Sequence, residues 1–431
     1  MVYLLQRRLL KMILELKFDN YKMFKGKNKL SFFADTRIKR LGSNYFDSLN
    51  RNVLKSVSLY GQNNIGKSNI LLLVRLIKEL MLGVENTPFN REMFGDTCRT
   101  NVSITFKTDA DKNWMEYSFT YDSFKYELIK ESLNEVIFYE TGNLSKKNVY
   151  LKDMDNNVLT IFGIDESSLL KLLPSKKPFL YCVSLENNVF ASLKPFLESF
   201  KSFANSLEIL SLFNIPIEKT IDVLKSDEKN KKIFILEFVK HADLSVKDFL
   251  YNENTIFKGR NGETISEDSL KRVDQIDRLK LFTKYGERYV PSILFDSAGT
   301  KKIEAIASYV YEAIINGKTL IIDELDNGLH YKLSRAILAV FNSFANTKGQ
   351  LLFTAHDLEL ISCKHMMRKD QIYFSFRKDD STSELFCLKD ASVANGGPRT
   401  VENLNRHYNR GEFGYIPSPN FVKYLSSINK E

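Results

Sequence analysis

The chain has 431 residues, of which 43% are hydrophobic and 27% are charged, and its formal net charge is +9. These values are ordinary for a soluble globular protein of two or three domains, at about 150 residues per domain, and its apolar runs are too short for a transmembrane helix. The basic excess is compatible with a phosphate-rich partner and equally with a solvated basic surface.

The N-terminus and the cysteines bear on the compartment. Residues 1–11 contain two arginines and several leucines but lack the long apolar core and cleavage site of a secretion signal. Met12 begins a strand-like run, so the preceding residues are interpreted either as a mobile extension or as the product of a misplaced start codon.

The cysteines have no paired spacing, which argues against a zinc site or a disulfide framework and favours reduced thiols in the cytoplasm. They are Cys98, Cys182, Cys363 and Cys387.

The first third of the chain predicts strands around one helix. Two alternating runs within Ile13–Phe33 predict an antiparallel hairpin whose turn contains Gly26. A third strand is predicted at Ser56–Tyr60 and runs directly into a glycine-bearing loop, Gly61–Ser68. Leucines and isoleucines at helical spacing then predict a helix over Asn69–Met81.

The rest of the chain alternates between strand and helix patterns. Four strand-like runs between Asn101 and Tyr150 predict an antiparallel layer: VSITFK, MEYSFTY, KYELIKES and NEVIFYE. Asp165–Leu250 has helical periodicity, clearest in SLKPFLESFKSFANSLEILSLF, and predicts an inserted helical subdomain in which Pro216 separates two helices. A polar stretch, Asn252–Asp277, precedes the strand LKLFTKYG. Beyond Phe295 the pattern is helix, buried strand, helix, buried strand.

The loop GQNNIGKS fits the pattern G-x4-G-K-[ST] between a strand and a helix, as a phosphate site requires. Its backbone N–H groups are expected to surround the β-phosphate of ATP, while Lys67 neutralises the β and γ oxygens from a solvent-accessible site. The Ser68 hydroxyl is expected to bind Mg²⁺. The predicted nucleotide-binding residues of this loop are Gly61, Asn63, Asn64, Gly66, Lys67 and Ser68.

A pair of carboxylates follows the apolar run Thr319–Ile322. Asp323 lies at the carboxyl end of this predicted buried strand, where it can hold Mg²⁺, and Glu324 comes one residue later, where it can orient or deprotonate water. Such a pair is weak evidence by itself. Together with the phosphate loop it predicts the second half of a nucleotide site, because burying two carboxylates is otherwise costly.

A histidine follows the third buried strand, Gln350–Thr354, in the sequence Thr-Ala-His-Asp. His356 can donate a hydrogen bond to the γ-phosphate from this position, so we predict that it is the switch residue of the site. The alternative interpretation is an ordinary polar residue capping the strand.

In order and spacing, the segments GQNNIGKS, DSAGTKK, LIIDELDNGLH and FTAHD resemble the head domains of ABC, SMC and RecF ATPases. The resemblance implies an α/β P-loop fold of the ABC type and a head-to-head homodimer or higher oligomer that closes on ATP. It implies that Ser297 and Gly299 touch the γ-phosphate of the partner subunit. A helix starting near Thr300 fits that role, since its N-terminus favours an anion.

The same resemblance implies that Asp326 communicates across the dimer and that His330 lies in an LH element of non-transporter members. In the resemblance, Ser297–Thr300 occupies the place of the signature motif. Two departures argue against a membrane transporter: a glutamine of the Q-loop type is not identifiable in the predicted antiparallel layer, and this signature lacks its usual Leu-Ser-Gly-Gly start. The expected organisation is an N-terminal ATPase lobe at 1–160, a helical insertion at 161–250 and a C-terminal ATPase lobe at 251–431, with no membrane partner.

Nearly the whole chain resembles the bacterial AAA-type ATPases of the AbiLi, RloA and PARIS AriA kind, on its start ILELKFDNYKMFKG and its tail ENLNRHYNRGEFGYIP. The segments FVKHADLSVKDF and RKDQIYFSFRKDDSTSELFCL contribute to the likeness. This resemblance implies an ATPase of an anti-phage, abortive-infection system that senses an invader or holds a separate effector, a nuclease or toxin. The alternative is a RecF-like or SMC-like repair protein whose ATP-closed dimer binds DNA through a basic surface.

Overall fold

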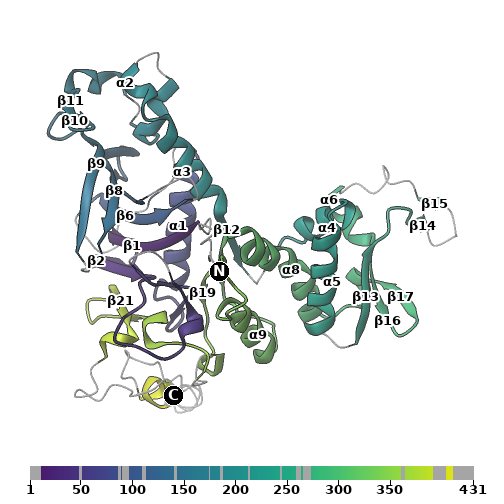
Figure 1. The fold of residues 1–431 in the computed structure, drawn as a ribbon. Helices are drawn as coiled ribbons and strands as arrows, with labels where there is room; N and C mark the ends of the chain where they lie inside the picture. Colours follow the sequence, from purple (N-terminus) through teal and green to yellow (C-terminus); the bar gives the residue numbers. More distant parts are fainter. Residues whose placement is uncertain are drawn as a thin grey trace, which may run out of the picture.

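The computed structural model divides into a large body built on one sheet and a smaller lobe on the far side of a long helix (Figure 1). It describes residues 11–47, 51–85, 89, 97–108, 113–139, 143–173, 175–184, 188–211, 214–242, 245–258, 264–265, 273–360, 365–391 and 404–410. Among these residues, no helix combines the length and the apolar character needed to cross a bilayer. Most of the C-terminal tail motif lies outside them, apart from helix α10 (Leu404–Asn409) and the next residue.

Antiparallel strands form one half of the large sheet, in agreement with the predicted layer. In several of them, buried residues alternate with more exposed ones over part of the strand, because one face packs on helices and the other faces water. Two of the predicted runs, KYELIKES and NEVIFYE, are parts of a single long strand, β8. The strands are β1 (Met12–Tyr21), β2 (Phe24–Ser31), β6 (Arg99–Lys107), β7 (Trp114–Asp122), β8 (Glu127–Phe138), β9 (Leu144–Asp153), β10 (Val158–Ile161) and β11 (Ile164–Asp165).

Mostly parallel strands form the other half of the sheet, and those in its middle are buried on both faces. Five of them form four parallel pairs, and their largely apolar sequences fit a sheet covered on both sides. The strands are β12 (Leu207–Ser211), β18 (Thr319–Asp323), β19 (Gln350–Thr354), β5 (Ser56–Tyr60), β20 (Ile372–Arg377) and β21 (Ser383–Cys387). β21 pairs with β2 and joins the two halves, in the order β11-β10-β9-β8-β7-β6-β1-β2-β21-β20-β5-β19-β18-β12.

The first hairpin is present, but its turn is not at Gly26, so this prediction was wrong. β1 and β2 connect through Lys22 and Met23, and Tyr21 pairs with Phe24. Asn20 and Lys22 adopt positive φ values of 55° and 50°, which tighten the turn without a glycine. Gly26 lies within β2, where it also has a positive φ.

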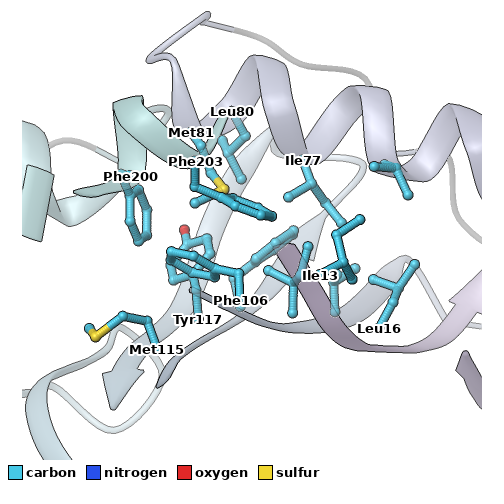
Figure 2. Close-up of a cluster of buried hydrophobic side chains, with 14 of the residues drawn as sticks. Ile13, Leu16, Ile77, Leu80, Met81, Phe106, Met115, Tyr117, Phe200 and Phe203 are labelled. Carbon is cyan, nitrogen blue, oxygen red and sulfur yellow. The ribbon is translucent and has the colours of Figure 1, made fainter. Parts of the chain in front are cut away.

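Helices α1 (Lys67–Met81) and α3 (Lys194–Ser206) cover the inner face of the sheet. Figure 2 shows their apolar side chains meeting those of the strands. The rings of Phe203 on α3 and Phe106 on β6 stack with centroids 4.4 Å apart, while Ile77 and Leu80 of α1 are completely or almost completely buried. This core fixes α1, and therefore the loop that precedes it, against the sheet.

The predicted helix over residues 192–213 is only half helical. It ends at Ser206, and Leu207–Ser211 forms the edge strand β12, which pairs in parallel with β18. The apolar spacing in Leu-Glu-Ile-Leu-Ser suits either a helix or a strand, and the free edge of β18 decides between them. Inside the span predicted as a helical insertion, this strand therefore belongs to the large sheet.

The smaller lobe combines helices with a three-stranded antiparallel sheet in the order β13-β16-β17. Its elements are α4 (Glu218–Lys225), α5 (Lys229–Ala242), β13 (Val246–Tyr251), α6 (Val273–Leu279), β16 (Leu281–Tyr285), β17 (Arg288–Pro291) and α7 (Ser292–Phe295). The predicted strand LKLFTKYG is confirmed as β16. Helix α8 (Ala298–Asn316) contacts α4 and α5 and leads back to β18 (Figure 1).

The predicted alternation after Phe295 is confirmed as α8, β18, α9 (Tyr331–Phe341) and β19. Because β5, β18 and β19 run in parallel, the segments that follow them emerge at the same edge of the sheet. The other short strands are β3 (Tyr45–Phe46), β4 (Val53–Leu54), β14 (Phe257–Lys258) and β15 (Thr264–Ile265), and the short α-helix α2 spans Asn188–Ala191.

Candidate nucleotide-binding and hydrolysis site

The predicted phosphate loop lies at the carboxyl end of β5 and turns directly into α1. Gly61 has a φ of 141°, and a Cβ there would collide with the Ser375 carbonyl oxygen on β20. Gly66 has a φ of 93°, and its Cβ would lie 2.7 Å from the ring of Phe24. Both glycines are therefore required by backbone conformation and by close neighbours.

Strand β20 supports this loop through two side chains that sequence reasoning missed. The Ser375 hydroxyl donates a hydrogen bond to the Ile65 carbonyl at 2.8 Å, and Arg377 Nη2 donates to the Asn64 carbonyl at 2.5 Å. Asn64 itself has a positive φ of 58°. More than 300 residues separate the partners in sequence, so no local pattern in the loop could have indicated them.

Lys67 is buried, contrary to the expectation of a solvent-facing side chain. It is 6% exposed, and its Nζ donates hydrogen bonds to the Gly61 and Gln62 carbonyls at 2.6 and 2.7 Å. Burial lowers the pKa of the Lys67 ammonium to about 8, although the nearby carboxylates of Asp323 and Glu324 act in the opposite direction. The ammonium thus lies inside the loop whose backbone is predicted to surround a phosphate.

The two predicted Mg²⁺ ligands lie in contact with each other. The Ser68 hydroxyl donates to Asp323 Oδ1 at 3.1 Å, and the Thr354 hydroxyl donates to the same oxygen at 2.6 Å. In the described part of the chain, His, Cys, Asp and Glu side chains form no cluster of three or more that could hold a metal. A hydroxyl with a single carboxylate fits Mg²⁺, which binds proteins through one or two carboxylates and takes further ligands from substrate phosphates and water.

Thr354 also fixes the residue beside Asp323. The Glu324 N–H donates to Thr354 Oγ1 at 2.7 Å, and Glu324 has a left-handed φ of 58°. The buried Thr354 hydroxyl therefore holds both predicted residues: it donates to the Asp323 carboxylate and accepts from the Glu324 backbone N–H. Sequence reasoning treated this threonine only as the end of a strand.

Replacing Thr354 with valine is expected to raise the Mg²⁺ concentration needed for half-maximal activity. Valine keeps the shape but leaves the Glu324 N–H without its acceptor, at a cost of about 1–3 kcal/mol. It also leaves Ser68 as the remaining donor to Asp323 Oδ1. Phosphate release titrated against Mg²⁺ measures the change, and Thr354→Ser is the control that restores the hydroxyl. If the Mg²⁺ dependence is unchanged in Thr354→Val, the Thr354 hydroxyl does not orient the metal ligand.

Both oxygens of the Glu324 carboxylate have polar neighbours. Asn327 Nδ2 donates to Oε2 at 2.6 Å, and His356 Nε2 lies 3.6 Å from Oε1. The side chains of Glu324 and His356 are 35% and 41% exposed, so both remain accessible from solvent. The structure thus brings together the two residues predicted to act on water and on the γ-phosphate.

Asp326 joins the two loops of the site within one chain. Its Oδ2 accepts hydrogen bonds from the backbone N–H groups of His356 and Asp357, at 2.8 and 2.6 Å. Burial, together with the negative charges of Asp326 and Asp357, raises the pKa of the nearby Tyr60 hydroxyl well above its ordinary value. The communication of Asp326 across a dimer remains a prediction, whereas its contact with the switch segment is a feature of the single chain.

The signature segment begins α8. Ser297 is the N-cap residue, and its hydroxyl accepts a hydrogen bond from the Thr300 N–H at 3.0 Å, so the helix starts at Ala298, two residues before the expected position. Gly299 lies against Gly328, since a Cβ there would be 3.6 Å from the Gly328 carbonyl oxygen. The signature therefore contacts the turn that follows Glu324 in its own chain.

A buried acidic pair anchors the signature to the smaller lobe. Tyr285 on β16 donates to Asp296 at 2.6 Å, and Ser292 donates to Glu304 at 2.8 Å. Burial raises the pKa of Glu304 well above its ordinary value, and the neighbouring Asp296 raises it further. These contacts connect the residue just before Ser297 to a strand of the smaller lobe.

His330 has a local role that can be stated from the structure. It is the N-cap residue of α9, and its Nδ1 accepts a hydrogen bond from the Lys332 N–H at 3.3 Å. Lys22, in the turn between β1 and β2, also contacts α1: its Nζ donates a hydrogen bond to Asn69 Oδ1 at 3.4 Å.

Comparison with known proteins is consistent with this geometry. A family described as "AAA domain, putative AbiEii toxin, Type IV TA system" matches residues 56–362. An "ATP/GTP phosphatase" of Helicobacter pylori (strain ATCC 700392 / 26695) is 29% identical over 212 residues, which are 44% of this chain and 54% of that protein. The chain thus spans about half the length of this curated relative.

Solved SMC head domains are also similar, at 12% identity. One, bound to the C-winged helix domain of ScpA, has a TM-score of 0.43 over 87% of this chain and 96% of its own. Another, from Thermotoga maritima, has a TM-score of 0.41 over 87% of this chain and 98% of its own.

Since the matched family model covers more than half of the chain, from β5 through β19, the chain belongs to this AAA-domain family of ATPases, with an α/β P-loop fold.

Proposed function

We propose that the protein binds ATP with Mg²⁺ and hydrolyses it to ADP and phosphate. The observation that carries this proposal is the contact of Ser68 with Asp323 beside the phosphate loop. Lys67 and the backbone N–H groups of Gly61–Ser68 would hold the phosphates, and Ser68 and Asp323 would hold the metal. When bound, Mg²⁺ supplies positive charge that offsets the charge of the phosphate oxygens.

Glu324 is the proposed general base. Its carboxylate is partly exposed and follows Asp323 directly, so it can accept a proton from water that attacks the γ-phosphate. His356 is the proposed sensor of the γ-phosphate, because it follows the neighbouring strand and its backbone is held by Asp326. The two side chains face each other across the site.

Release of inorganic phosphate from γ-labelled ATP, with and without Mg²⁺, tests the proposal. We expect Mg²⁺-dependent turnover by the wild-type chain. Phosphate release no faster than that of the Lys67→Ala variant would contradict it, because the site would then contribute nothing to hydrolysis.

We also propose that ATP closes a homodimer through the signature. Leu294 and Phe295, just before Ser297, are 70% and 64% exposed, and adjacent large apolar side chains of this kind favour a surface that meets another protein. The hydroxyl of Ser297 caps α8, whose N-terminal N–H groups favour an anion.

The variant Ser297→Arg is expected to bind ATP as a monomer with nearly wild-type affinity but to lose ATP-driven association. The bulky cation would enter the γ-phosphate site of the partner subunit. Equilibrium dialysis at low protein concentration measures binding, and light scattering with ATP measures association. An equal loss of ATP affinity where only monomer exists would contradict a signature acting between subunits.

The proposed biological role is anti-phage defence in the cytoplasm, in which the ATPase senses an invader or holds a separate nuclease or toxin. The family description, which names a putative AbiEii toxin, supports this direction. Cells that carry the gene with its genomic neighbours would be challenged with phages, and Lys67→Ala would serve as the inactive control. Equal plating on wild-type and Lys67→Ala cells across a broad phage panel would argue against the role.

A further inference from the structure

We infer that Asn327 is a positioning residue that aims the Glu324 carboxylate at the attacking water. This inference rests on the proposed ATP hydrolysis and deepens it. The Asn327 amide donates to Glu324 Oε2 at 2.6 Å, while Oε1 faces His356 Nε2 at 3.6 Å. One carboxylate oxygen is therefore fixed, and the other remains available for proton transfer.

The backbone of Glu324 does not orient its side chain by itself. Its left-handed φ of 58° and its N–H bond to Thr354 fix the Cα, but the remaining bonds of a partly exposed glutamate can still rotate. A second attachment at the carboxylate removes this freedom. An amide suits the role because its N–H donates to an ionised carboxylate and does not compete for the proton taken from water.

Asn327 is held in place from two sides. Its backbone N–H donates to the Glu324 carbonyl at 2.9 Å, which closes the turn, and Lys302 on α8 donates from Nζ to the Asn327 carbonyl at 2.8 Å. Lys302 lies one helical turn beyond Gly299 of the signature. The contacts thus run from the signature helix through Asn327 to Glu324, so displacement of α8 is expected to change the aim of the base.

Steady-state hydrolysis by Asn327→Ala is the first test. We expect kcat to fall about 10- to 100-fold, which corresponds to losing one hydrogen bond to a charged group, and KM for ATP to stay within about twofold. Asn327→Asp has the same shape but replaces the donor with a repelling carboxylate, so its kcat should fall further. Lys302→Met should lower kcat in the same direction by a smaller factor.

A double-mutant cycle separates positioning from a general structural role. Single-turnover hydrolysis is measured in Glu324→Gln with and without Asn327→Ala. If Asn327 acts through the carboxylate, the second substitution should slow the Glu324→Gln variant by less than about threefold. A fall as large as in the wild-type background would overturn the inference, because Asn327 would then act independently of Glu324.

Asn346→Ala is the matched control. Asn346 is also an asparagine that secures a turn, through Nδ2 bonds to the Phe341 and Gly349 carbonyls at 2.8 and 2.7 Å, but it lies between α9 and β19, outside the site. It should lower the melting temperature with little change in kcat. If the wild-type chain hydrolyses ATP and Asn327→Ala has the same kcat, the positioning role is refuted and the proposed function stands. If the wild-type chain itself does not hydrolyse ATP, the proposed function is refuted.

Discussion

Glu324→Gln is expected to slow ATP hydrolysis about 10²- to 10⁴-fold, the usual contribution of a general base. Glutamine has nearly the same shape but cannot accept the proton of the attacking water. Lys67, Ser68 and Asp323 remain to bind Mg-ATP, so the variant should accumulate as an ATP-bound dimer. Phosphate release measures the rate, and size-exclusion chromatography in ATP measures the dimer.

His356→Ala is the comparison for this experiment. The imidazole after β19 is better placed to contact the γ-phosphate than to deprotonate water, so His356→Ala should slow hydrolysis less than Glu324→Gln. Hydrolysis at nearly the wild-type rate in Glu324→Gln, with loss only in His356→Ala, would reverse the two roles.

Lys67→Ala is expected to weaken ATP binding about 10- to 100-fold or more, because charge-assisted hydrogen bonds to the phosphates are lost. Equilibrium dialysis with labelled ATP gives the affinity. Because the side chain is 6% exposed, the alanine also removes packed methylene groups, so the melting temperature should fall modestly.

Lys67→Met is the control for that packing effect. Methionine restores much of the buried volume without the ammonium, so its affinity for ATP should remain low while its melting temperature approaches that of the wild type. Wild-type affinity in both variants would show that the loop does not bind phosphate through Lys67.

Features determined by local sequence could be predicted. The phosphate loop lies between a strand and a helix because Gly61 and Gly66 supply backbone conformations that few other residues adopt. The buried strand before Asp323 and Glu324 was recognisable because a continuous apolar run ends in two carboxylates. The roles of the site residues remain predictions that the variants above test.

Features that depend on distant partners could not be predicted. The sequence of β12 predicts a helix, but pairing with the edge of β18 makes it a strand. The sequence predicts an accessible Lys67, but the loop backbone surrounds its side chain. Ser375 and Arg377 support the loop from a strand more than 300 residues away.

The sequence by itself therefore determined which residues carry the predicted chemistry and the order in which strands bring them to one edge of the sheet. Only the tertiary structure decided how those residues are oriented. Thr354 bridges Asp323 and Glu324, and Asn327 fixes the Glu324 carboxylate. The physical reason is that hydrogen bonds a few ångströms long depend on side-chain directions that packing between distant segments sets, whereas glycine conformation and apolar periodicity act within a few residues.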